Sequence, residues 1–265
     1  MNEQAKTRPQ KPRVGHPTSQ TREGITIKKC VALEEFHGCV ELQRKVWGEA
    51  DLEIEPVTMF VVACITGGQV LGAFVGDKLV GYTLAVVGFR QGGMYLHSHQ
   101  TAVSAEHRDR GIGRMLKLFQ RDDALSRGIR LVEWTFDPLE MKNAHFNLNR
   151  LGAVCRRYLP NLYGVTTSPL HRGIETDRLV AEWQLDSPRV IAAIENLAPT
   201  VTDAPATIEV PTEVELWKQD TKRTQEVQAR VREEFTKWFA RGYAALGVRR
   251  EARSTAYVLA PWSDF

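Results

Sequence analysis

Apolar residues in this chain recur with two periods, which together predict an alternation of helices and strands. Spacings of three and four, as in Ile112, Met115, Leu116 and Phe119, place apolar side chains on one face of a helix. Short runs that alternate or are continuously apolar predict strands. The segments identified in this way are strands at 25–31, 70–75, 79–89, 95–103, 131–136 and 154–158, and helices at 33–48, 57–65, 111–127 and 143–151.

The order of these segments is typical of an α/β domain with a mixed central sheet flanked by helices. We assign this domain to residues 24–168. The pattern continues with a half-buried strand at 179–185, a helix at 190–197, an extended segment at 207–210, a helix at 219–241 and a hairpin at 243–259. These segments predict an additional α+β C-terminal region over residues 169–265, in which Trp217, Trp238 and Trp262 need burial.

Residues 1–23 are basic and rich in Pro, Gln, Thr and Ser, which predicts a disordered tail. The alternative, an arm that binds nucleic acid, is disfavoured because the tail carries few charges, and the net charge of the whole 265-residue chain is only +3. The tail has no apolar centre of the kind that a secretory signal requires, and no apolar run approaches the length of a membrane span. We therefore expect a cytoplasmic protein without nucleic-acid or membrane partners.

The four cysteines are scattered among apolar neighbours, and no two of them have the C-x-x-C spacing of metal or redox sites. Free, buried thiols in a reducing cytosol are the expected state of these residues. No metal is predicted.

The most informative stretch is Arg108-x-x-Gly111-x-Gly113, which lies between the strand at 95–103 and a helix. Unpaired N–H groups and a positive dipole end make such a glycine-lined helix start a suitable phosphate site. The third glycine of the dinucleotide-binding fingerprint would fall at Leu116, which excludes that motif. The Gly-Lys-Ser/Thr ending of a P-loop is absent, which excludes that motif too. The stretch resembles motif A of the GNAT acyltransferases, over about residues 25–164.

The resemblance implies a GNAT fold and an acyl-CoA co-substrate, acetyl-CoA or another short acyl-CoA. In GNAT proteins the sheet splays beside the motif-A strand, and the thioester and pantetheine lie along that strand. The residues that the resemblance assigns to the co-substrate are Thr101, Ala102 and Val103 on the strand, Arg108, Arg110, Gly111, Ile112, Gly113 and Arg114 for the pyrophosphate, and Asn143 beside the pantetheine.

His97 and His99 lie two residues apart on the predicted strand, so both side chains point to one face. Their position resembles the histidine pair that arylalkylamine N-acetyltransferase uses in proton removal, which makes His99, and less so His97, the candidate general base. A structural role inside the sheet and a metal pair are the alternatives, although no third metal ligand is evident. Glu133 is a candidate second base, but a salt bridge is its more ordinary role.

The general acid is where the chain departs from the family pattern. The usual tyrosine would stand at Leu148, four residues before Gly152. Tyr158, Tyr163 or water must then protonate the CoA thiolate if this chain is active.

Two groups of residues are candidates for contact with the acceptor. The acidic segment with Glu49, Asp51, Glu53 and Glu55 either attracts a cationic substrate or is a solvated loop. Residues Arg156, Arg157, Tyr158, Asn161 and Tyr163 follow the last matched strand, where an arginine suits a carboxylate-bearing acceptor such as an amino acid.

The sequence therefore predicts an N-acyltransferase that acts on a small-molecule amine, with a homodimer left open. The competing hypothesis is a catalytically weak acyl-CoA-binding or regulatory protein, which the leucine at position 148 and the unassigned C-terminal region would fit.

Overall fold

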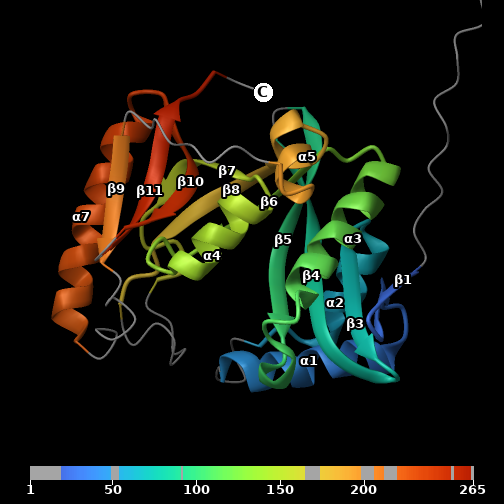
Figure 1. The fold of residues 1–265 in the computed structure, drawn as a ribbon. Helices are drawn as coiled ribbons and strands as arrows, with labels where there is room; N and C mark the ends of the chain where they lie inside the picture. The colour runs from blue at the N-terminus through green and yellow to red at the C-terminus, as the bar shows by residue number, and fades with distance from the viewer. Residues whose placement is uncertain are drawn as a thin grey trace, which may run out of the picture.

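The computed structural model describes residues 19–48, 54–90, 92–164, 174–197, 206–211, 220–251 and 254–263. They contain an eleven-stranded sheet with the strand order β1-β2-β3-β4-β5-β6-β8-β7-β10-β11-β9 (Figure 1). The strands are β1 Ser19–Arg22, β2 Ile25–Lys29, β3 Gln69–Val75, β4 Lys78–Arg90, β5 Gly93–Val103, β6 Leu131–Phe136, β7 Val154–Leu159, β8 Arg178–Gln184, β9 Ala206–Pro211, β10 Tyr243–Arg250 and β11 Ser254–Pro261. The β5–β6 pair is parallel, and the other pairs are antiparallel.

Helices cover both faces of the first half of the sheet. The helices are α1 Leu33–Trp47, α2 Val57–Ile65, α3 Ile112–Ser126, α4 Met141–His145, α5 Pro188–Ile194 and α7 Thr221–Phe239, with a 3-10 turn η2 at Ala105–His107 and a π-helical turn η3 at Phe146–Arg150. Phe36 of α1 and Phe60 of α2 pack on one face of the sheet with Val70 of β3, whereas α3 packs on the other face with Leu71. Because successive strand residues point to opposite faces, α1 and α2 lie opposite α3.

The predicted segments from 25 to 158 are all observed, with bounds that shift by a few residues. One difference lies in the predicted disordered tail, where Ser19–Arg22 form β1 and pair with β2. The two residues between these strands, Glu23 and Gly24, have φ of 52° and 75°. Left-handed conformation at both positions is the geometry that a two-residue hairpin turn requires. Residues 1–18, the rest of the predicted tail, lie outside the described residues.

Strand β8 lies inside the sheet, between β6 and β7. It pairs with β6 through Glu133↔Glu182 and with β7 through Cys155↔Ala181. The strand is therefore buried on both faces rather than half-buried as predicted. The domain boundary that we predicted at residue 168 separates two strands that share hydrogen bonds.

The C-terminal region continues the same sheet. Strand β10 joins β7 at Ala245↔Cys155, and one hydrophobic core contains Leu148 after α4, Trp183 of β8 and Phe235 of α7. The predicted helix and terminal hairpin of this region are observed as α7, β10 and β11, while Trp217 lies outside the described residues. No helix in the described part of the chain is both long and apolar enough to span a membrane.

Candidate functional site

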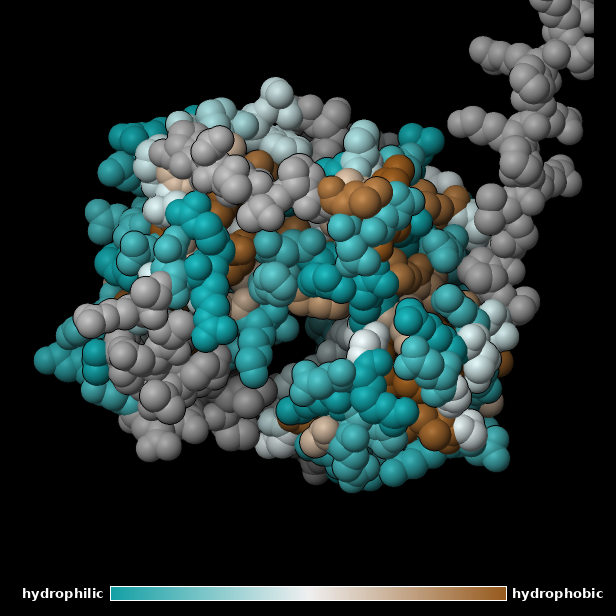
Figure 2. Space-filling view, in the orientation of Figure 1, coloured by the Kyte–Doolittle hydropathy of each residue, from teal (hydrophilic) through white to brown (hydrophobic). Residues whose placement is uncertain are grey.

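The sheet opens between β5 and β6. These strands pair only at Leu96↔Val132 and His97↔Glu133, whereas the other edge of β6 pairs with β8 along its whole length, from Leu131 to Phe136. From Ser98 to Val103, the edge of β5 that faces β6 pairs with no strand among the described residues. We call this divergence the fork. Figure 2 shows an opening in the molecule at this place, bordered by hydrophilic residues.

The loop between β5 and α3 stands at the open end of the fork. Gly111 caps the helix with φ of 74°, a conformation that favours glycine. The first helical bond runs from Met115 N–H to the Gly111 carbonyl, so the preceding N–H groups lie outside the helical ladder. A Cβ added at Gly113 would meet nothing within 4 Å, so nothing within the protein requires glycine there. Open space above unpaired N–H groups fits a phosphate.

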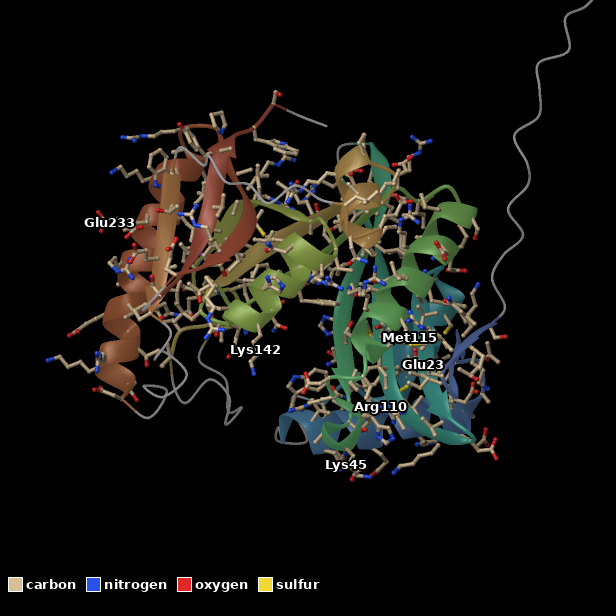
Figure 3. The ribbon with its side chains drawn as sticks, in the orientation of Figure 1. Glu23, Lys45, Arg110, Met115, Lys142 and Glu233 are labelled. Atoms are coloured by element: carbon tan, nitrogen blue, oxygen red, sulfur yellow. The ribbon has the colours of Figure 1, made fainter. Side chains whose placement is uncertain are left out.

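The other residues predicted for the co-substrate surround this loop. Arg108 and Arg110 are exposed beside it, and Figure 3 places Arg110 and Lys142 of α4 on opposite sides of the opening. Thr101, buried Ala102 and Val103 belong to the free edge of β5, and Asn143 is exposed on α4. Arg114 differs, because its guanidinium donates to the Ile194 carbonyl at the end of α5. Only its backbone N–H is therefore suited to a phosphate.

A β-bulge sets the direction of the two histidines. Gln100 pairs with Leu84 and Ser98 pairs with Ala85, so His99 is the extra residue of β5. The rings of His97 and His99 lie 6.1 Å apart. Burial, and then the neighbouring charge of His99, lower the pKa of His97. His97 is therefore neutral near pH 7 and able to accept a proton.

His99 contacts a carboxylate from the segment between α1 and α2. Its Nε2 lies 2.8 Å from Oε1 of Glu55, and the hydrogen bond lowers the pKa of Glu55 although burial opposes this. Of the acidic segment considered in the sequence, Glu49, Asp51 and Glu53 lie outside the described residues. Glu55 is therefore bonded to His99 and is not simply a solvated carboxylate of a loop.

Two glutamines hold Glu55 in place. The side chain of buried Gln43, on α1, accepts from the Glu55 N–H at 3.0 Å and donates to its carbonyl at 3.2 Å. Gln100 donates to Gln43 at 2.8 Å and accepts from the hydroxyl of Tyr82 at 2.8 Å. Our sequence analysis missed both glutamines. The spacing of Gln43 on α1 shows only that it points inward, and its partners lie far along the chain.

Beyond the histidines, the same face of the sheet carries a charged cluster. Buried Glu133 bonds to Arg90 and, at 2.8 Å, to Arg157. Buried Glu182 accepts from Arg157 at 3.1 Å and from Arg156 at 2.6 Å. A bulge at Arg156 lets two successive residues of β7 reach one face. Each of these arginine side chains is about one-third exposed, so the cluster presents guanidinium edges to solvent over two buried carboxylates.

The remaining catalytic candidates have structural partners. Two guanidinium groups bind Glu133, which does not support its use as a free base. The Tyr158 hydroxyl donates to Asp177 at 2.6 Å, and its ring stacks on Phe235 of α7. Burial, and then Asp177, raise the pKa of Tyr158 well above its usual value, so it is a poor proton donor here. Leu148 is buried in the core.

Asn161 and Tyr163, which we grouped with the acceptor pocket, differ from each other. Asn161 closes a turn through its bonds to Asp177 and Thr176, whereas Tyr163 is exposed and its hydroxyl lies 3.0 Å from Thr135 Oγ1. No group of three His, Cys, Asp or Glu residues within the described ranges is arranged to hold a metal ion.

Comparisons with known proteins agree with this geometry. Residues 36–152 match the model of the acetyltransferase (GNAT) family. No protein with a curated description matches the chain in sequence.

Solved structures with the same fold include a Desulfovibrio desulfuricans protein assigned to the GNAT family, with a TM-score of 0.50 and 15% identity over 61% of this chain and 99% of that one. A Streptococcus mutans UA159 protein has a TM-score of 0.50 and 21% identity over 60% and 99% of the two chains. The Salmonella typhimurium protein yncA, solved with its cofactor acetyl-CoA, has a TM-score of 0.51 and 16% identity over 62% and 96%. The fold is the GNAT fold, and the part of the chain that carries the match to the acetyltransferase (GNAT) family is residues 36–152.

Proposed function

We propose that this protein is an acyl-CoA-dependent N-acyltransferase that acts on the amine of a small molecule bearing a carboxylate, such as an amino acid. The observation that carries the proposal is the fork. It combines an unpaired strand edge, a glycine-lined helix start at one end, and a histidine with a carboxylate partner beside it.

The donor side follows from the free edge of β5. The pyrophosphate would bind the N–H groups of Ile112, Gly113 and Arg114, with Arg108 and Arg110 adding positive charge. The pantetheine would then run back along β5 toward Ser98, because α3 begins after the C-terminal end of that strand. Unpaired backbone groups on this edge can hydrogen-bond the pantetheine and donate to the thioester oxygen as charge develops there.

Proton removal falls to His99 in this proposal. The amine nitrogen attacks the thioester carbon, its proton passes to Nδ1 of His99 directly or through one water, because the Nε2–H donates to Glu55, and the C–S bond breaks. Glu55 orients the imidazole and stabilises the imidazolium that forms. The thiolate leaves with a proton from solvent, because neither Leu148 nor Tyr158 is placed to donate one and a thiol is acidic enough to need no stronger acid.

The acceptor class rests on the arginine cluster. Arg90, Arg156 and Arg157 are held by buried Glu133 and Glu182, so their exposed edges are fixed before a ligand arrives. A fixed guanidinium binds a carboxylate with little further loss of side-chain entropy. The cluster carries a net charge of +1, from three arginines and two glutamates, on the face that His97 shares. The four free cysteines fit a reducing compartment such as the cytoplasm.

The test is release of free thiol from acetyl-CoA with matched pairs of amines, each an amino acid and the same amine without its carboxylate. We expect the amino acid to be preferred at least about tenfold in kcat/KM, in line with one charge-assisted hydrogen bond. Arg157→Met should reduce that preference, whereas Arg230→Met, on the exposed side of α7, should not. If CoA binds and no amine releases thiol above background, an acyl-CoA-binding protein without transfer activity replaces this proposal.

A further inference from the structure

A buried lysine lies at the closed end of the fork. Lys117 of α3 is 4% exposed. Its Nζ lies 2.8 Å from Ser98 Oγ, 3.1 Å from Gln120 Oε1 and 3.9 Å from the centre of the Trp134 ring. Ser98 and Trp134 are the first residues beyond the last paired positions of β5 and β6. The amine therefore lies where the two strands separate, on the α3 face of the sheet.

The contacts of Lys117 hold a cation but do not neutralise it. No carboxylate within the described ranges pairs with it, and burial alone lowers the pKa of Lys117 to about 7. An ammonium buried without a counter-ion is costly, and such groups tend to lose their proton unless an anion is supplied. The buried site around Lys117 therefore lacks the negative charge that would balance an ammonium.

A hydrogen-bond donor beside Lys117 also lacks a partner. Gln120 is fully buried, and its Nε2 has no hydrogen-bond partner in the described part of the chain. Its Oε1 and the Ser98 oxygen already accept from Lys117. Buried donors without partners are rare in native proteins and indicate a missing acceptor. An acceptor of hydrogen bonds at this position would satisfy Gln120, and a negatively charged one would also pair with the ammonium of Lys117.

The expected path of the acyl-CoA along β5 indicates which anion would reach Lys117. This step rests on the proposed function. A donor bound at the Arg108–Arg114 loop and extended back along β5 directs its acyl group toward Ser98. The acyl end therefore approaches Lys117. We infer that the preferred donor is an acyl-CoA whose acyl chain ends in a carboxylate, which the Lys117 ammonium binds at the closed end of the fork.

The test compares the binding of donors that differ only at the acyl end. The probes are stable analogues of succinyl-CoA and butyryl-CoA in which CH₂ replaces the thioester sulfur, and free CoA. Titration calorimetry should show the succinyl analogue binding at least about tenfold tighter than the butyryl analogue to the wild-type protein, as expected for one charge-assisted hydrogen bond. Lys117→Met should abolish or reverse this ratio. Lys222→Met, which changes an exposed lysine on α7, should preserve it.

A second measurement needs no variant. At pH 8 most Lys117 side chains lack a proton, so binding of a carboxylate should take up a proton, which calorimetry in two buffers of different ionisation enthalpy detects. The butyryl analogue should cause no such uptake. His97 on the opposite face also senses charge at Lys117, but burial lowers its pKa from the usual value, so it stays neutral at pH 8 with either analogue.

Each outcome decides the inference. Equal affinities of the wild type for the two analogues, or equal proton uptake with both, overturn it while leaving the proposed function intact if free CoA binds. Failure of free CoA and both analogues to bind overturns the donor assignment itself, and the inference with it.

Discussion

The contact between Glu55 and His99 allows the sharpest test of the catalytic arrangement. The two side chains meet at 2.8 Å and are 27% and 30% exposed. A hydrogen bond to a charged group contributes about 1.5–3 kcal/mol, and the partial exposure of this pair places it at the low end. About 1.4 kcal/mol corresponds to tenfold in rate. We therefore expect Glu55→Gln to lower kcat/KM about tenfold, because the imidazolium loses its charged partner.

The effect of the histidine should be larger, and the two effects should not add. His99→Gln removes the general base and should cost about a hundredfold, within the usual range for such a group. Because Glu55 acts only through His99, adding Glu55→Gln to His99→Gln should cost nothing further. The coupling in this cycle should then equal the whole effect of Glu55→Gln.

The assay is thiol release at saturating acyl-CoA, with CoA affinity measured by calorimetry in every variant. CoA affinity should stay within twofold, since neither residue borders the Arg108–Arg114 loop. Glu234→Gln is the matched control, because Glu234 also meets its partner, Arg230, at 2.8 Å and is 33% exposed. Additive losses in the double variant would show that Glu55 acts independently of His99. A His99→Gln enzyme within threefold of wild type would remove histidine from the mechanism.

Three further predictions concern binding and stability. Gly113→Glu should abolish CoA binding in calorimetry, because the new carboxylate repels a phosphate. The Tm should change little, because the new side chain enters open space. An unchanged affinity for CoA would contradict the assignment of the loop. Arg232→Met should cost about 3 kcal/mol in urea unfolding, since it leaves the fully buried Asp177 carboxylate without its guanidinium, and a cost below 1 kcal/mol would refute this. His97→Gln should reduce the loss of stability that the protein shows below about pH 6.5. Burial lowers the pKa of His97, so as the pH falls the unfolded wild-type chain binds a proton before the folded one does. Identical pH profiles of the two proteins in thermal melts would contradict this.

The role of the C-terminal region also has a direct test. A chain that ends at residue 170 lacks β8, which lies between β6 and β7, and should be aggregated in size-exclusion chromatography. A monodisperse and folded product would show that the first half of the sheet is independent.

Local patterns in the sequence predicted most of the elements and the donor loop. The periods of apolar residues identify β2 to β7, and glycines at 111 and 113 before an amphipathic helix identify a phosphate-binding loop. These signals are short-range, because helix and strand periods and helix starts depend on residues a few positions apart. The histidine pair on β5 was likewise visible in the sequence.

The partners of those elements depended on the tertiary structure. Nothing local places β8 between β6 and β7, because strand pairing across the sheet is decided by burial and register over long separations. Glu55 meets His99 across 44 positions. In the sequence Lys117 is one polar residue of a helix, and only the packing of Ser98 and Trp134 against α3 shows that its amine is buried. Sequence periodicity determines which face a side chain takes, whereas its charge partner is set by the packing of distant strands.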